Sequence, residues 1–304
     1  MDLHQSIPKA FSVAAFFGLA LAPPDGARAR GAAVPVASVG TAAAIPSQAV
    51  YTSMASTAPT TSPGAPHSSS QSTSQPVGHQ GPCDAGMVLV EGEACTDAEQ
   101  VCLKYIDPPP YQNLRCGEYA KPAKCKGARV PRRFCIDREE YAEPTASSDA
   151  KDALPVVNKN WGEAKALCEA RGARLCKEAE WEFACEGPDM SPYPYGWKRD
   201  STLCNFDRTD LGGAMEKLKD HRAPLSAYPE CLSPFGVHNM VGNVDEWVER
   251  EGMAPPSRSA LRGGWWLPGR NRCRAATLAH GEEYSGKQVG FRCCKDAPAS
   301  GASP

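Results

Sequence analysis

Residues 239–247 read Asn-Met-Val-Gly-Asn-Val-Asp-Glu-Trp, and this stretch says more about the fold than any other part of the chain. Gly242 and Asn243 favour a tight turn. The regular spacing of apolar residues that marks a helix fades after about residue 186, and glycine, proline, asparagine and tryptophan punctuate the sequence from there onward. The sequence therefore predicts a large domain with little regular secondary structure, ordered by turns, covalent bridges and bound ions.

Two helices are predicted before this irregular region. Residues 161–171 place apolar side chains at helical spacing, with Asn160 as N-cap and Gly172 just past the end. Residues 177–186 (KEAEWEFACE) are rich in helix formers and stop at Gly187.

The region from residue 83 to residue 135 has a different character. It contains six cysteines and a run of three prolines at residues 108–110, so we expect a loop-rich part held by its own bridges. Residues 86–90 (GMVLV) give one clear strand signal, and residues 134–136 (FCI) give the next.

Fourteen cysteines are the unusual feature of the composition, and all of them lie between Cys83 and Cys294. Structural zinc sites usually draw ligands two to four residues apart, and no CxxC pair occurs in the sequence. The spacing favours disulfides over metal or redox chemistry, and hence an oxidising compartment.

The N-terminal part indicates how such a compartment is reached. Residues 10–22 (AFSVAAFFGLALA) follow Lys9 and form an apolar stretch too short to cross a bilayer as a helix, which is typical of a secretory signal. We expect a signal peptide over residues 1–29, with cleavage after Ala22 or Ala29 left open. A disordered tether rich in Ser, Thr, Pro and Ala follows over residues 30–82, because residues 31–83 contain no charged side chain. The mature chain is expected to be secreted, periplasmic or in the cell envelope, without a membrane span.

The remaining composition is ordinary. The chain is 41% hydrophobic and 22% charged, and its net charge of -2 gives no electrostatic reason to expect nucleic acid as a partner. Residues 83–296 are about 210 residues, enough for one substantial core. A short disordered tail is predicted over residues 297–304.

A series of short motifs runs through this domain in a recognisable order. They are Leu154-Pro155-Val156-Val157, Arg174-Leu175, residues 178–184 (EAEWEFA), Tyr195-Gly196-Trp197, Cys204-Asn205, Phe235-Gly236-Val237, residues 239–247, Arg262-Gly263-Gly264 and Gly290-Phe291-Arg292. This succession resembles the formylglycine-generating enzyme (sulfatase-modifying factor) family. The resemblance implies an α+β fold related to C-type lectins, with little regular secondary structure and, here, many disulfides.

The resemblance also implies disulfide pairings. Cys168 with Cys293 matches one bridge of the family, and Cys185 with Cys273 is the best match to another. Cys204 and Cys231 are expected to pair because both flank the loop that leads into Gly236. Partners for the six N-terminal cysteines, Cys176 and Cys294 stay open.

Members of this family bind calcium in loops, where backbone and side-chain oxygens surround the ion. The matching residues form a first site and the start of a second, whose later ligands near Asp220 match poorly. The first set is Asn239, Met240, Gly242, Val244 and Glu246, and the second is Asn205 and Phe206. The alternative is a tight turn without an ion, with Glu246 paired to Arg262 or Arg292. Asp245 stands where the family usually has tryptophan, and would either add a ligand or disturb the loop.

The family's oxidases hold copper(I) between two cysteines that follow the motif Arg-Gly-Gly-Ser. Counting from Gly264, the first of these positions falls on Pro268 and the second on Cys273. Soft copper(I) in such a site needs two thiolates, and proline supplies none. We therefore expect no copper and no oxidase chemistry, with Cys273 as a catalytic residue only if that activity is retained.

Histidine and tryptophan give the remaining candidates. His221, His238 and His280 would form a site only if the fold brought them together, and surface or hydrogen-bonded core positions are the alternative. Trp197, Trp265 and Trp266 are expected to border a cleft that suits a peptide or a sugar. If their segment is a strand, Trp265 and Trp266 face opposite sides, so that only one of them lies inward.

Trp181 and Trp247 are the two tryptophans expected in the core.

The function predicted from the sequence is an exported binding or structural module without the oxidase site, with a peptide, protein or glycan as partner. The alternative is an extracytoplasmic oxidoreductase that modifies a peptide or a secondary metabolite.

Overall fold

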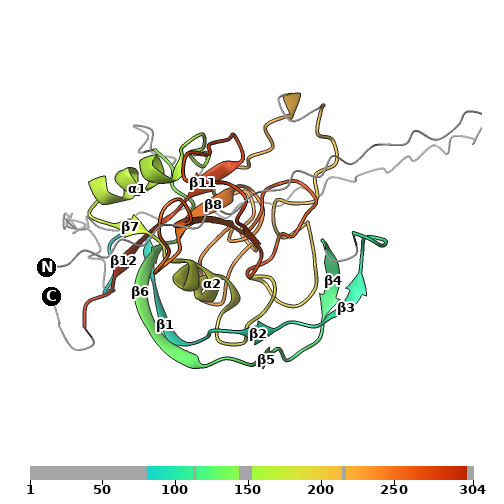
Figure 1. The fold of residues 1–304 in the computed structure, drawn as a ribbon, viewed down its shortest axis with the longest axis horizontal. Coiled ribbons are helices and arrows are strands. Elements are labelled where there is room, and N and C mark those ends of the chain that lie inside the picture. Colours follow the sequence, from blue (N-terminus) through green and yellow to red (C-terminus); the bar gives the residue numbers. More distant parts are fainter. Residues whose placement is uncertain (1–80, 112–113, 144–152, 214–216, 300–304) are drawn as a thin grey trace, which may run out of the picture. The chain divides into compact units, whose positions relative to one another are not determined.

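A computed structural model describes residues 81–111, 114–143, 153–213 and 217–299 (Figure 1). The predicted signal peptide and tether, and most of the predicted tail, lie outside these residues. The helices are α1 (Trp161–Ala170) and α2 (Glu178–Glu186). The strands are β1 (Met87–Cys95), β2 (Ala98–Glu99), β3 (Cys102–Tyr105), β4 (Cys116–Tyr119), β5 (Lys124–Cys125), β6 (Arg129–Asp137), β7 (Arg174–Leu175), β8 (Asp245–Glu249), β9 (Ser259–Arg262), β10 (Ala276–Thr277), β11 (Val289–Phe291) and β12 (Cys293–Asp296).

Both predicted helices are confirmed, and their ends follow from capping. At the start of α1, the Asn160 side chain accepts a hydrogen bond from the Glu163 N–H while the Glu163 carboxylate accepts one from the Asn160 N–H, each at 2.9 Å. This reciprocal pair satisfies two donors that a helix start leaves open. Gly172 and Gly187 follow the two helices with φ of 68° and 66°, a region that glycine enters without steric cost.

Two four-stranded sheets form the framework. In the first, of order β1-β6-β12-β7, β1 and β6 pair antiparallel from Met87 opposite Asp137 to Cys95 opposite Arg129. In the second, of order β10-β9-β8-β11, the pair β8 and β11 is parallel, which sets Gly290 opposite Glu246. Short ladders β2-β5 and β3-β4 extend the cysteine-rich N-terminal part (Figure 1).

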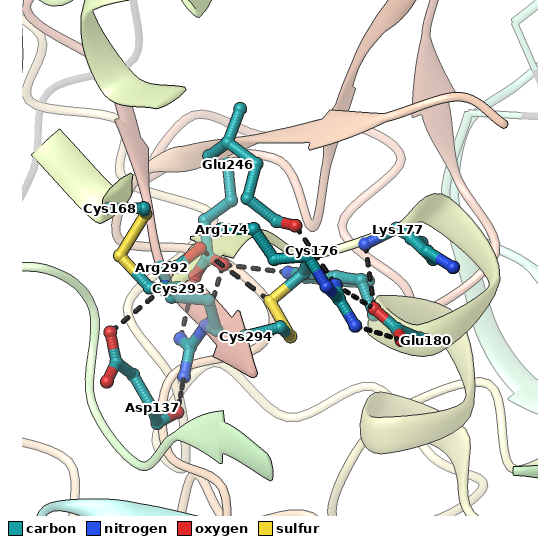
Figure 2. Close-up of a disulfide and its surroundings, with 12 residues drawn as sticks. Asp137, Cys168, Arg174, Cys176, Lys177, Glu180, Glu246, Arg292, Cys293 and Cys294 are labelled. Carbon is teal, nitrogen blue, oxygen red and sulfur yellow. Dashed lines mark hydrogen bonds and ion pairs between the residues drawn. A yellow bond between two sulfur atoms is a disulfide. The ribbon is translucent and has the colours of Figure 1, made fainter. Parts of the chain in front are cut away.

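The adjacent cysteines of β12 form disulfides in two different buried clusters. Cys293 bonds to Cys168 in α1, and Cys294 bonds to Cys176, just after β7 (Figure 2). Neighbouring residues of a strand point to opposite faces. Accordingly, Cys293 lies in the buried cluster around Trp161 and Trp247, whereas Cys294 lies in the cluster around Trp181.

All fourteen cysteines fall within the described residues, and all are paired. The expected pairs Cys168–Cys293, Cys185–Cys273 and Cys204–Cys231 are among the seven disulfides. The pairs that the sequence left open are Cys83–Cys135, Cys95–Cys125, Cys102–Cys116 and Cys176–Cys294.

No helix within the described part of the chain is both long and apolar enough to cross a membrane.

Candidate functional site

A buried ion pair lies at the centre of the domain. Glu246 in β8 and Arg292, between β11 and β12, are 1% and 0% exposed. Arg292 donates from Nε and Nη2 to the two carboxylate oxygens at 2.7 Å, and the Trp181 indole N–H donates to Glu246 Oε2 at 2.7 Å. The remaining guanidinium donors reach the backbone carbonyls of Asp137, Arg138 and His238. Every donor of this buried cation is therefore satisfied. Figure 2 labels Arg292 together with Glu246 and Asp137.

This arrangement is the alternative that the sequence offered for Glu246, with Arg292 as its partner. The other candidate, Arg262, instead pairs with Glu178 and Glu182 of α2. Arg292 reaches Glu246 because β8 and β11 run parallel, with Gly290 in register with the carboxylate.

A second buried carboxylate, Glu140, lies next to this pair and was not predicted from the sequence. It is 2% exposed, and its side chain accepts hydrogen bonds from the amides of Asn239 and Asn243, the closest at 2.8 Å. Burial raises the pKa of Glu140 to about 8, and the nearby charge of Glu246 adds to the effect. The only sequence signal was its position, three residues past the end of a strand.

The two groups of expected calcium ligands lie side by side. The Asn243 N–H donates to the Asn205 carbonyl at 2.8 Å, and Gly242, at φ 80°, faces the same carbonyl so closely that a Cβ would lie 2.4 Å from it. The oxygen of the Asn205 side chain, however, accepts from Arg208 Nε at 2.9 Å.

Calcium in this loop stays a prediction. Glu246 and Asn205 both direct their side-chain oxygens at arginines, so an ion bound as expected would have to replace Arg292 and Arg208 there. Met240, Val244 and Phe206 are buried in the same region. Within the described residues, no group of three or more His, Cys, Asp or Glu side chains is arranged to hold a metal ion.

The loop after Arg262 carries the residues at the oxidase positions. Gly263 and Gly264 have φ of 88° and 71°, and a Cβ at Gly263 would lie 2.7 Å from the Met240 carbonyl. Glycine is needed there because no other residue fits that backbone and that contact. Beyond the turn, the Cys273 sulfur is bonded to Cys185 of α2 at 2.09 Å, and Pro268 is exposed. No thiol is free at either position.

The same loop encloses a cavity of about 140 Å³, and Asp245 at the start of β8 lies in its wall. Asp245 is 7% exposed, and its Oδ1 accepts the Gly264 N–H at 2.8 Å. Burial raises the pKa of Asp245 to about 7 against the effect of that N–H, and the charge of Glu246 contributes further. The Asp245 carboxyl thus lies in the wall of a cavity and holds the Gly264 turn, while its expected role as an added ion ligand stays a prediction.

The three candidate tryptophans of the cleft do not share one site. Trp265 lines the cavity with Asp245, whereas Trp197 borders separate hollows beside Tyr195. The expectation that Trp266 borders a cleft is wrong, because Trp266 is fully buried and lines none of these hollows. The expected strand ends at Arg262, and the two left-handed glycines then turn the chain, so strand alternation does not govern this pair. Trp181 and Trp247 are both fully buried, as expected.

The three histidines do not converge. His238 Nδ1 lies 2.8 Å from Glu139, His280 stacks on Tyr284 with ring centroids 3.7 Å apart, and His221 lies beside Asp210. Each therefore has its own local partner, and no histidine site forms.

Comparison with known proteins shows the family of this chain. The sequence model of one protein family, the sulfatase-modifying factor enzyme 1-like domain, matches residues 112–297. The chain belongs to this family. The α+β, disulfide-rich fold expected from the motifs is therefore the fold of a sulfatase-modifying factor enzyme 1-like domain.

Relatives of the sulfatase-modifying factor family differ in whether their names imply activity. A Bos taurus protein named inactive C-alpha-formylglycine-generating enzyme 2 is 31% identical over 53% of this chain and 58% of its own length. The formylglycine-generating enzyme of the same organism is 27% identical over 47% of this chain and 44% of its own length. The chain thus spans less than two thirds of either relative. The crystal structure of CarF is similar at a TM-score of 0.46 and 16% identity, over 70% of this chain and 98% of that one.

Proposed function

We propose that this protein is an exported binding module built on the sulfatase-modifying factor fold, without the copper-dependent oxidase chemistry of the family's enzymes. Its ligand is a peptide, protein or glycan. The observation that carries the proposal is the disulfide between Cys185 and Cys273.

Of the two oxidase positions, Pro268 and Cys273, only the second is a cysteine, and its sulfur is bonded in this disulfide. Copper(I) binds thiolates, and a sulfur in a disulfide is not a thiolate. Cys273 is also 0% exposed, so neither substrate nor metal reaches it without opening of the domain. Pro268, at the other position, has no side-chain atom that could bind copper.

Export is supported by the covalent framework. Seven disulfides in one domain are typical of proteins that fold in an oxidising compartment. The apolar stretch at residues 10–22 is the segment expected to direct export. The relative named inactive C-alpha-formylglycine-generating enzyme 2 is consistent with a family fold that has been kept while its chemistry was lost.

The test combines copper binding with product analysis. Oxidised full-length protein is incubated with copper and then with a cysteine-containing sulfatase-type peptide, and the peptide is examined for aldehyde by mass spectrometry. We expect no aldehyde and no copper retained against a copper(I) chelator. Aldehyde formed by protein free of other enzymes would overturn the proposal.

A matched variant isolates the role of the bridge. Cys185→Ser frees the Cys273 thiol and leaves Pro268 in place. Because a single thiolate cannot form the two-sulfur site, this variant is also expected to form no aldehyde. A formylglycine-generating enzyme treated in parallel supplies the positive control.

A further inference from the structure

The cavity beside Asp245 is built around a carboxyl that lacks a full set of partners. Asp245 Oδ1 accepts one hydrogen bond, from the Gly264 N–H, and the described residues supply no other donor to its side chain within hydrogen-bond distance. A buried carboxylate is costly unless it is paired. The adjacent Glu246 does not relieve this cost, because it carries the same charge and its own oxygens are taken by Arg292.

The size of the cavity decides what can enter. Its volume of about 140 Å³ corresponds to four or five water molecules at about 30 Å³ each. Sites for whole cofactors or drug-sized ligands usually measure about 300–1,000 Å³. This cavity therefore takes one group of a larger ligand.

The walls limit the chemistry of that group. Trp265, Leu267 and Pro268 provide apolar surface along the opening, while Asp245 is the acidic group in the wall. An alkyl stem suits the apolar surface, and a cationic end suits the carboxylate and the tryptophan face. We propose that this cavity takes the protonated amine of a lysine side chain carried by a polypeptide ligand.

Other groups fit less well. A carboxylate or phosphate would meet the charge of Asp245, which is 7% exposed. A neutral hydroxyl would leave that charge without a counter-charge. Arg270 also lines the cavity, and its charge acts on Asp245. It is exposed, its guanidinium donates to the Ala276 carbonyl at 3.4 Å, and it forms no ion pair with Asp245 within the described residues.

This inference rests on the proposed binding function and names the group that is recognised. The probes are n-butylammonium, n-butanol of matched length, and an acetylated, amidated glycine-lysine-glycine peptide with or without acetylation of the lysine amine. Binding to the oxidised full-length protein is measured by calorimetry or by NMR titration at pH 8. We expect the amine and the free-lysine peptide to bind, and the alcohol and the acetylated peptide to bind at least about tenfold more weakly.

Two variants locate the binding. Asp245→Asn keeps the acceptor for the Gly264 N–H and removes the charge, so it should weaken amine binding about tenfold to a hundredfold. Arg270→Gln removes a competing cation at an exposed position, so this variant should bind the amine more tightly. Unfolding midpoints and intact disulfides show that both variants are folded.

Equal binding of amine and alcohol, or unchanged amine binding by folded Asp245→Asn, would overturn the inference. Failure here is distinguishable from failure of the proposed function. Aldehyde in the copper assay contradicts the inactive module whatever the amine does, whereas loss of the lysine preference contradicts only the assignment of this cavity.

Discussion

Neutralising one member of the buried pair Glu246–Arg292 should produce the largest loss of stability available from a single charge in this domain. In Glu246→Gln the shape of the side chain is kept, but Arg292 stays buried with carbonyl acceptors and without its paired carboxylate. Glu140 is a remaining buried carboxylate whose charge acts on Arg292, but it forms no ion pair with the guanidinium within the described residues. Breaking a buried pair by removing one partner costs about 3–5 kcal/mol. For a domain of this size, that corresponds to a fall in Tm of about 6–20 °C, at about 2–4 °C for each kcal/mol.

The measurement is urea unfolding of the oxidised protein, followed by circular dichroism and by tryptophan fluorescence. Fluorescence is informative because the Trp181 indole donates to Glu246. Glu99→Gln serves as the matched control, since Glu99 forms an exposed pair with Lys126 and its loss should leave the midpoint unchanged. A loss below about 1 kcal/mol in Glu246→Gln would refute the reasoning, because it would mean that Arg292 finds water or another partner.

A double-mutant cycle extends the test. Arg292→Met combined with Glu246→Gln removes both charges, so the double variant should be less destabilised than the sum of the single changes. Strict additivity would show that the two side chains do not interact.

Three further outcomes are expected. Replacing Cys185 and Cys273 together by alanine opens a loop of 88 residues and should lower the free energy of unfolding by about 4–5 kcal/mol, measured by denaturant titration; a loss below about 1 kcal/mol would speak against the bridge. The pKa of Asp245 is raised to about 7 in the folded chain, so the native state binds an extra proton and the free energy of unfolding falls as pH rises from about 4 to 7. Because Asp245→Asn removes this titration, its free energy of unfolding should rise by a few kcal/mol relative to wild type over that range. Parallel pH profiles of the two proteins would contradict this. If calcium binds at residues 239–246, next to the buried carboxylate Glu140 that has no ion-pair partner, chelation should lower Tm and added calcium should restore it. An unchanged Tm would show that calcium does not stabilise the fold there.

Sequence reasoning reached the elements that local chemistry determines. The cap at Asn160, the glycines after each helix and the ordered motifs predicted α1, α2 and the family. The pairing of Cys168 with Cys293 came from the family resemblance. Cys176 and Cys294 stayed open because pairing depends on which strands become neighbours, and here β12 lies between β6 and β7.

The site was harder to predict because its partners come from distant parts of the chain. Glu246 had two candidate arginines, and only the parallel register of β8 with β11 selects Arg292. Glu140 looked like an ordinary polar residue after a strand, since nothing local shows that residues about 100 positions later bury it. Trp266 was named as a cleft residue together with Trp265 because nothing local decides which of the two tryptophans lies inward; the structure buries Trp266.

The paired cysteines of β12 also set an order of events during biosynthesis. The disulfides at Cys293 and Cys294 span 125 and 118 residues, the longest separations of the seven. Neither can close before nearly all of the domain has been synthesised, because both partners must be present. The three N-terminal bridges span at most 52 residues and can form while synthesis continues. Maturation should therefore leave a trappable species with an oxidised N-terminal part and four reduced cysteines, Cys168, Cys176, Cys293 and Cys294, visible as a discrete step when thiols are alkylated during a pulse-chase.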